Sequence, residues 1–237
     1  MELTRPSDDA IARLVRRHAL GSGPAESQLR ALAAWVSADA DAPTTVTEPG
    51  AVVRDHLADS LVALELPVVT EARHIADLGS GAGFPGLPLA IALPDAQVSL
   101  VESTGRKCAF IDRAAAACGV DNASVVYSRA EQWVEGREAC DLVVARALAP
   151  LPVVVEYAAP LLAVGGVLVV WRGRRDPEEE VRAARAAAVI GLEPHPVVPV
   201  EPYPSALQRH LHPMTKVRET PSRFPRRPGM AVKRPLA

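Results

Sequence analysis

Short apolar runs alternate with longer amphipathic stretches between residues 74 and 217. The apolar runs predict strands at residues 74–78, 98–102, 124–127, 141–145, 167–171, 196–200 and 210–217. The stretches between them predict helices at residues 86–93, 106–118, 152–162 and 176–190. Strands that alternate with helices form βαβ units, so we expect an α/β fold with a mostly parallel, seven-stranded sheet. The last two strands follow a proline-rich stretch and are expected to form a hairpin at one sheet edge.

The first 72 residues carry apolar side chains at helical spacing instead. Three helices are predicted, with apolar faces at Ile11, Leu14 and Val15, at Leu29, Leu32, Ala33 and Val36, and at Val53, Leu57, Leu61 and Leu64. Ser7 is a candidate N-cap of the first helix. We therefore divide the chain into an N-terminal helical cap, residues 1–72, and a main domain, residues 73–237, which ends in a basic tail.

The composition is that of a globular protein, with 49% hydrophobic residues among 237 and a net charge of −2. The charge is unevenly distributed, because residues 205–237 hold eight arginines and lysines and a single acid, Glu219. This asymmetry indicates a polyanionic partner, although a solvated tail that keeps the protein soluble would look the same.

The three cysteines, Cys108, Cys118 and Cys140, have neither disulfide-framework nor metal-ligand spacing. The polar, acidic N-terminus does not resemble a signal peptide, and glycines interrupt the longest apolar run, residues 161–171. We expect a cytoplasmic protein with reduced thiols, no bound metal and no membrane partner.

The stretch ADLGSGAGFPG follows the first predicted strand and holds four glycines in eight residues. In open α/β sheets ligands bind beyond the carboxyl ends of the strands, and glycines allow positive φ and close approach of a ligand. Gly81, Gly83 and Gly86 match the GxGxxG string of dinucleotide-binding folds, but the match begins about two residues after the strand. The alternative is an acid, Asp77, followed by alternating glycines from Gly79, a pattern of S-adenosyl-L-methionine (SAM) methyltransferases. A plain tight turn is the third possibility.

The ends of the next strands carry further polar candidates. Glu102 ends the second predicted strand, where a carboxylate can accept both ribose hydroxyls in NAD and SAM enzymes alike, or can simply be an exposed strand-end acid. The segment from Ser128 to Glu131 follows the third strand, where an adenine edge would lie. Arg146 closes the fourth strand, facing either a ligand or a carboxylate partner.

Several segments resemble one family closely. DLGSGAGFPGLPLAI, LVESTGRKCAFI, SRAEQW and VVARAL are similar to sequences of the bacterial small-subunit rRNA guanine-N7 methyltransferases of the RsmG (GidB) family. The resemblance runs from about residue 43 to the C-terminus. Asp55, His56, Asp59 and Ser60 resemble the family's Arg-His-x-x-Asp-Ser segment, with Asp55 in place of the basic residue. The stretch TPSRFPRRPGMAVKRPL is similar to its C-terminal signature.

The resemblance implies a class I SAM-dependent methyltransferase fold, Rossmann-like with an N-terminal helical extension. Its substrate would be a guanine in the decoding-centre (530) loop of 16S rRNA within the small ribosomal subunit. Together with the loop pattern it gives as cofactor-binding candidates Asp77, Gly79, Ser80, Gly81, Gly83, Phe84, Glu102, Ser103, Ala130, Glu131 and Arg146. The RNA-binding candidates are Arg54, Arg106, Lys107, Arg172, Arg226, Arg227 and Lys233. The family often has lysine where Arg172 stands.

The expected chemistry needs little from the protein. Guanine N7 carries a lone pair and no proton, so methyl transfer requires no general base, and the rate would come from in-line positioning. Arg146 is the one candidate catalytic residue. N7 lies in the deep groove of A-form RNA, so the target base must be unpaired or flipped out. We expect a monomer.

Two other functions stay open from the residues. An NAD(P)-dependent oxidoreductase would use Gly81, Gly83 and Gly86 for a pyrophosphate, and a non-catalytic ribosome-assembly factor would bind RNA without methyl transfer. The acids Asp77 and Glu102 argue against the second of these.

Overall fold

The computed structural model describes residues 6–21, 23–204 and 206–236, with the backbone alone for residues 6–8. Its strands are β1 (His74–Leu78), β2 (Gln97–Glu102), β3 (Ala123–Tyr127), β4 (Cys140–Arg146), β5 (Leu162–Arg172), β6 (Leu192–Pro194), β7 (Val198–Val200) and β8 (Arg209–Lys216). In this part of the chain they form one eight-stranded sheet in the order β3-β2-β1-β4-β5-β8-β6, with β7 pairing with β8. β1 to β5 run parallel to one another. β8 is antiparallel to each of the strands with which it pairs, β5, β6 and β7.

From β1 to β6 helical segments alternate with the strands as expected, and the others precede β1 or follow β8. The helical segments are α1 (Pro6–Arg17), α2 (Ala25–Ala38), α3 (Pro49–Ala51), η1 (Val52–Ala58), α4 (Asp59–Leu61), η2 (Val62–Glu65), α5 (Pro67–Thr70), α6 (Gly86–Ala92), α7 (Gly105–Cys118), η3 (Ala130–Gln132), α8 (Leu151–Ala158), α9 (Pro177–Ile190) and α10 (Met230–Lys233). The predicted third N-terminal helix is the run from α3 to η2, in which η1 is a π-helical turn and η2 a 3-10 turn.

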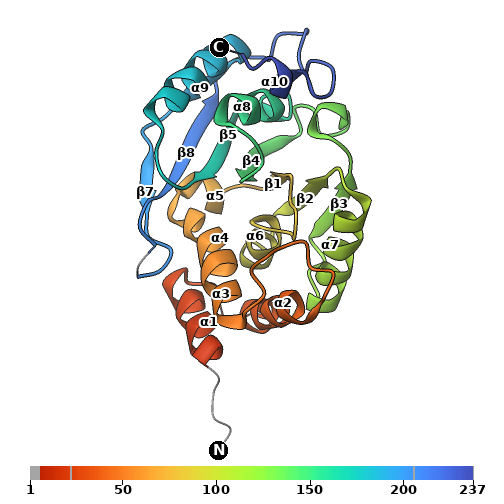
Figure 1. Cartoon of the computed structure of the whole chain (residues 1–237), viewed down its shortest axis with the longest axis vertical. Coiled ribbons are helices and arrows are strands. Elements are labelled where there is room, and N and C mark those ends of the chain that lie inside the picture. The colour runs from red at the N-terminus through yellow and green to blue at the C-terminus, as the bar shows by residue number, and fades with distance from the viewer. Residues whose placement is uncertain (1–5, 22, 205, 237) are drawn as a thin grey trace, which may run out of the picture.

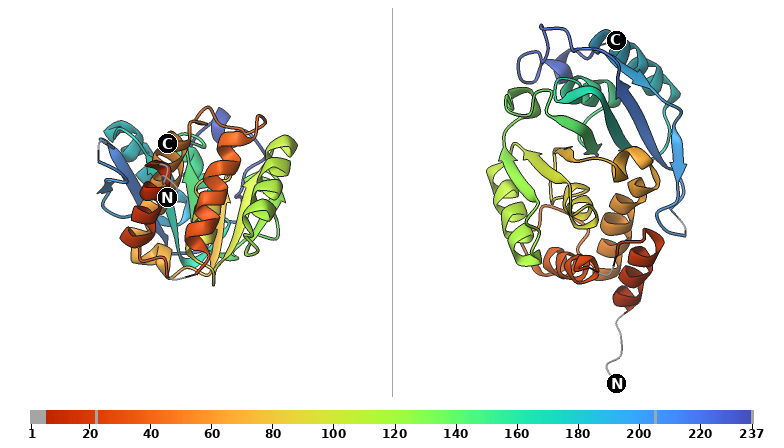
Figure 2. Two further views of the ribbon diagram at one scale, coloured as in Figure 1. Left: turned by 90° about the horizontal axis from the view of Figure 1, so that it is seen from below. Right: turned by 180° about the vertical axis from the view of Figure 1, so that it is seen from behind.

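Helices cover both faces of the sheet (Figures 1 and 2). Along β4, Leu142 and Val144 pack with the N-terminal helices, α6 and α7, while Val143 and Ala145 pack with α8 and α9. This alternation follows from the two-residue period of a strand buried on both faces. The N-terminal helices therefore share one hydrophobic core with the sheet, and the predicted boundary at residue 72 remains a prediction.

The predicted strands and helices agree with the structure within two residues at most ends, and the hairpin of β7 and β8 is confirmed. The count of seven strands is wrong, because the three-residue β6 ends in a proline and gave no strand signal. The helix predicted over residues 152–162 is also too long, since α8 ends at Ala158 and Pro160 cannot continue it. β5 instead begins at Leu162 and runs through the two glycines that looked like an interruption.

None of the described helices is both long and apolar enough to span a membrane.

Candidate cofactor and substrate site

The glycine loop begins directly after β1, at the carboxyl edge of the sheet. Gly79, Gly81 and Gly83 adopt φ values of +69°, +61° and +90°, which side-chain-bearing residues rarely adopt. Gly86 opens α6 for a different reason. A Cβ atom there would lie 2.1 Å from Leu100 Cδ2 and 2.8 Å from Asp77 Oδ2, so only glycine lets the helix start pack this closely against the sheet.

Asp77 fixes the loop from inside the protein. Its side chain is fully buried, and Oδ2 accepts a hydrogen bond from the Gly86 backbone N–H at 3.0 Å. Burial raises the pKa of Asp77 to about 7, against the opposing effects of that hydrogen bond and of the charge on Arg146. Its second oxygen, Oδ1, is buried with no hydrogen-bond partner in the described structure. Asp77 thus lies behind the loop, with one acceptor to spare.

Glu102 lies at the end of β2, beside the loop. Its carboxylate accepts hydrogen bonds from the backbone N–H groups of Gly81 at 3.2 Å and Thr104 at 2.8 Å, and Lys107 Nζ is 3.9 Å away. Only 5% of the residue is exposed. A carboxylate oriented in this way presents fixed acceptors at the strand tip, and its role as a ribose-binding acid stays a prediction.

A cavity of about 150 Å³ opens beside these groups. Four predicted cofactor residues line it, namely Gly79, Ser103, Ala130 and Glu131. Leu148, Tyr157 and Val232 line it as well, and none of them is a predicted cofactor residue. Aliphatic side chains such as Leu148 and Val232 carry no chemical signal in a sequence, and Val232 reaches the cavity from α10, about a hundred residues downstream. The Gly229 N–H donates to Glu131 Oε1 at 3.1 Å and holds α10 there.

The other predicted cofactor residues support the loop. Ser80 is 1% exposed and its hydroxyl donates to the Asp77 carbonyl at 2.9 Å. Phe84 is 4% exposed, and the His56 ring stacks on it with a centroid separation of 4.4 Å. The guanidinium of Arg146 lies 5.6 Å from the centroid of the Phe84 ring.

Arg146 is fixed by several acceptors. Nη1 donates to Asp59 Oδ2 at 2.8 Å and to the Asp55 carbonyl at 3.1 Å, and Nη2 lies 3.2 Å from His56 Nδ1. Burial and the nearby Arg146 charge lower the pKa of His56 to about 4, so the imidazole is neutral at neutral pH. Because an arginine only donates, His56 Nδ1 accepts, and the proton sits on Nε2, which faces Thr44 Oγ1 at 2.9 Å. We call Arg146, His56, Asp59 and Phe84 the Arg146 cluster.

Comparison with known proteins shows to which family the chain belongs. The model of the GidB family, described as rRNA small subunit methyltransferase G, matches residues 38–211. The ribosomal RNA small subunit methyltransferase G of Rubrobacter xylanophilus is 42% identical over 80% of this chain and 75% of its own length. That of Chloroflexus aggregans is 43% identical over 81% of this chain and 82% of its own length. This protein belongs to the rRNA small subunit methyltransferase G family. The resemblance found in the sequence is thereby confirmed.

The solved structures agree with the fold expected of this family. Geranyl diphosphate methyltransferase in complex with SAM superposes with a TM-score of 0.52 at 16% identity, over 67% of this chain and 84% of that one. At such low identity the likeness concerns the fold alone, and that fold is the class I SAM-dependent methyltransferase fold. In the part of the chain that the structure describes, no cluster of three or more His, Cys, Asp or Glu residues is placed to hold a metal ion.

The predicted RNA-binding residues of this family member fall into two groups. Arg54 pairs with Asp55, Lys107 with Glu102, Arg172 with Glu179 and Arg226 with Glu156. Arg106, Arg227 and Lys233 are exposed and have no charged partner among the described residues. Two further arginines lie near these groups: Arg209, whose Nε is 3.3 Å from Asp59 Oδ1, and Arg129, which lines the cavity of about 150 Å³. Both belong to segments that the sequence singled out, the basic tail and the segment from Ser128 to Glu131, although neither was a predicted RNA-binding residue.

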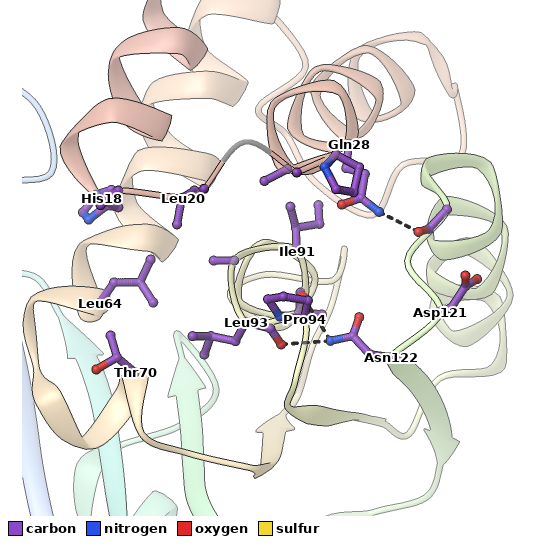
Figure 3. A pocket seen from close by; sticks show the side chains of 18 residues that line it. His18, Leu20, Gln28, Leu64, Thr70, Ile91, Leu93, Pro94, Asp121 and Asn122 are labelled. Atoms are coloured by element: carbon purple, nitrogen blue, oxygen red, sulfur yellow. Dashed lines mark hydrogen bonds between the residues drawn. The ribbon is translucent and has the colours of Figure 1, made fainter.

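A second cavity, of about 480 Å³, lies at the opposite end of the sheet and is shown in Figure 3. Its walls come from the α1–α2 connection, the end of α6 and the segments that precede β2 and β3, where Pro94 and Asn122 lie. Asn122 Nδ2 donates to the carbonyls of Ala90, Leu93 and Ala96. The Asn122 amide thereby joins α6 to the segment before β3, and the cavity lies at the amino ends of the strands, away from the glycine loop and Glu102.

Proposed function

We propose that this protein transfers the methyl group of SAM to N7 of a guanine in the 530 loop of 16S rRNA. The observation that carries the proposal is the pairing of the glycine loop with the buried Glu102 carboxylate at the carboxyl edge of the sheet, in a chain of this family. We further propose that it acts as a cytoplasmic monomer on the small ribosomal subunit.

The residues present fit a SAM molecule. Glu102 offers oriented acceptors to two ribose hydroxyls, and the ligand would approach the backbone at Gly79 once the Leu148 side chain, which lies against it, moves aside. Ala130 and Glu131 would border the adenine, and the free Oδ1 of Asp77 suits an ammonium group reached through water. When bound, SAM supplies an electrophilic methyl group. The cavity of about 150 Å³ is smaller than usual ligand pockets, so Leu148 and Val232 have to move aside.

The Arg146 cluster would shape the place for the base. With its nitrogens bound to Asp59, His56 and the Asp55 carbonyl, Arg146 is suited to hold η1 against Phe84 and the glycine loop. We therefore assign it a positioning role. Guanine N7 has no proton to lose, and the neutral His56, already hydrogen-bonded to Arg146 and Thr44, is not required as a base. The protein's contribution is then alignment of the lone pair with the methyl group.

The test is to map N7-methylguanine in 16S rRNA from cells with and without the protein. Loss of the modification at a single guanine in the 530 loop, restored by the wild-type gene, is the expected result. Methylation of purified unmethylated subunits with labelled SAM provides the direct assay. A modification that persists without the protein would refute the proposal, and calorimetric binding of NAD in place of SAM would favour an oxidoreductase.

A further inference from the structure

A groove that the proposed site does not use is lined by residues of α1, η1 and the β7–β8 connection. Figure 1 shows α1 close to the loop that follows β7. It has a volume of about 430 Å³. Ala10 and Arg13 line it from α1, Val53 and Arg54 from η1, and Tyr203 and Pro204 from the connection. We call it the α1 groove.

The charge of the α1 groove is one-sided. Its lining residues include three arginines, Arg13, Arg17 and Arg54, and no acid. Arg17 is engaged with Glu65 and with the carbonyls of Glu201 and Pro202, and Arg54 pairs with Asp55. Arg13 is exposed and has no charged partner among the described residues. The groove thus offers one uncommitted cation at its rim, which suits an anionic group such as a phosphate.

The groove also has an apolar lining. Tyr203 and Pro204 contribute rings, and Ala10 and Val53 contribute small apolar surfaces. The Arg54 guanidinium lies 5.7 Å from the centroid of the Tyr203 ring. Tyrosine rings and guanidinium planes are surfaces on which unpaired nucleobases stack, and the exposed cation Arg13 beside them favours a nucleotide over an uncharged peptide.

The α1 groove is also connected to the Arg146 cluster. The Tyr203 hydroxyl donates to Asp55 Oδ1 at 2.8 Å, and the Asp55 carbonyl accepts from Arg146 Nη1 at 3.1 Å. One residue of η1 therefore touches both the groove and the cluster. An RNA strand that reaches the cluster would pass close to the groove.

We propose that the α1 groove holds an unpaired nucleotide of the rRNA near the target guanine, with its base against Tyr203 and its phosphate on Arg13. This inference rests on the proposed function and adds a second anchoring point on the substrate.

The test compares two arginines of the same helix. Arg13→Ala removes the uncommitted cation of the groove. Arg16→Ala removes another exposed arginine of α1, which has no charged partner among the described residues and does not line the groove. Binding of unmethylated small subunits and of protein-free 16S rRNA is measured over a range of salt concentrations, with SAM affinity as the control. We expect Arg13→Ala to weaken both RNA complexes roughly tenfold and to lower the salt slope by about 0.7. Arg16→Ala should change neither, and both variants should bind SAM as the wild type does.

Ala10→Phe fills the groove without changing any charge, and it should weaken RNA binding while thermal unfolding shows that the fold persists. Equal effects of Arg13→Ala and Arg16→Ala on RNA binding would show that only the overall positive charge of α1 matters, and would overturn the proposal. Wild-type binding by a folded Ala10→Phe protein would overturn it as well. A loss seen with subunits but not with protein-free rRNA would identify the occupant as a ribosomal protein. If the wild type methylates no rRNA, the proposed function fails instead.

Discussion

Arg226, one of the predicted RNA-binding residues, is better placed to stabilise the fold. It belongs to the C-terminal segment, and its guanidinium grips the carboxylate of Glu156 on α8, with Nε to Oε1 at 2.6 Å and Nη2 bound to Oε2. Nη2 also donates to the Arg234 carbonyl at 2.8 Å. Glu156 is 1% exposed, so this pair joins the C-terminal segment to the core on the face of the sheet that α8 and α9 cover.

The cost of Arg226→Ala follows from what it leaves behind. Removing one partner of a buried ion pair strands an uncompensated charge, which typically costs about 3–5 kcal/mol. The Arg226 side chain is 24% exposed, so water would reach Glu156 once the guanidinium is gone. We therefore expect the lower end, about 3 kcal/mol of unfolding free energy, which corresponds to a urea midpoint lower by about 1 M or more.

Urea unfolding followed by circular dichroism measures this loss, and Arg227→Ala is the matched control. Arg227 is exposed and has no charged partner among the described residues, so its removal should change the unfolding free energy by less than about 0.5 kcal/mol. Adding Glu156→Gln to Arg226→Ala should recover part of the loss, because it removes the stranded charge. A stability loss below 1 kcal/mol for Arg226→Ala, or no recovery in the double variant, would refute the reasoning.

Three further outcomes are expected. The pKa of His56 is lowered to about 4, so below about pH 6.5 the folded state binds fewer protons than the unfolded state. The unfolding free energy should therefore fall as the pH drops from about 6.5 to 4. In urea titrations at several pH values, His56→Asn should make this pH dependence weaker. Gly86→Ala places a Cβ atom 2.1 Å from Leu100 Cδ2 and should lower the unfolding free energy by about 1–3 kcal/mol. The control for crowding is Gly105→Ala at the start of α7, where the Cβ atom would meet no atom closer than 3.6 Å. Glu102→Gln should weaken SAM binding about tenfold or more in calorimetry, because a charge-assisted acceptor is lost, and an unchanged affinity would remove Glu102 from the cofactor site.

The sequence was informative wherever function and local geometry coincide. The glycine loop could be placed because positive φ at Gly79 and Gly81 demands glycine, and Glu102 because the strand period fixes where β2 ends. The apolar runs likewise predicted the parallel strands, since most residues of β1, β2, β4 and β5 are buried, whereas the edge strand β3 is only half-buried. β6 was not predicted, because three residues are too few to show the two-residue alternation of a strand.

What could not be predicted are contacts between distant segments. A sequence shows that Arg226 and Arg227 are both basic, but the structure gives one of them a buried carboxylate 70 residues upstream and leaves the other exposed. The same applies to Val232, which borders the cavity of about 150 Å³ because Ala231 packs into the core beside α8 and Gly229 is bound to Glu131. Partner choice of this kind depends on tertiary packing, and charge or hydropathy alone does not encode it.

Asp59 shows how the N-terminal helices become part of the site. Its Oδ2 binds Arg146 of β4, its Oδ1 lies 3.3 Å from Nε of Arg209 on β8, and its carbonyl accepts from Trp171 Nε1 of β5 at 2.7 Å. Three neighbouring strands thus hold one residue at the end of the π-helical turn. Because Asp55 and His56 of that turn also bind Arg146, the helices cannot shift relative to the sheet edge without breaking the cluster. The N-terminal helices therefore set the geometry on one side of the Arg146 cluster, and the glycine loop with Phe84 sets it on the other.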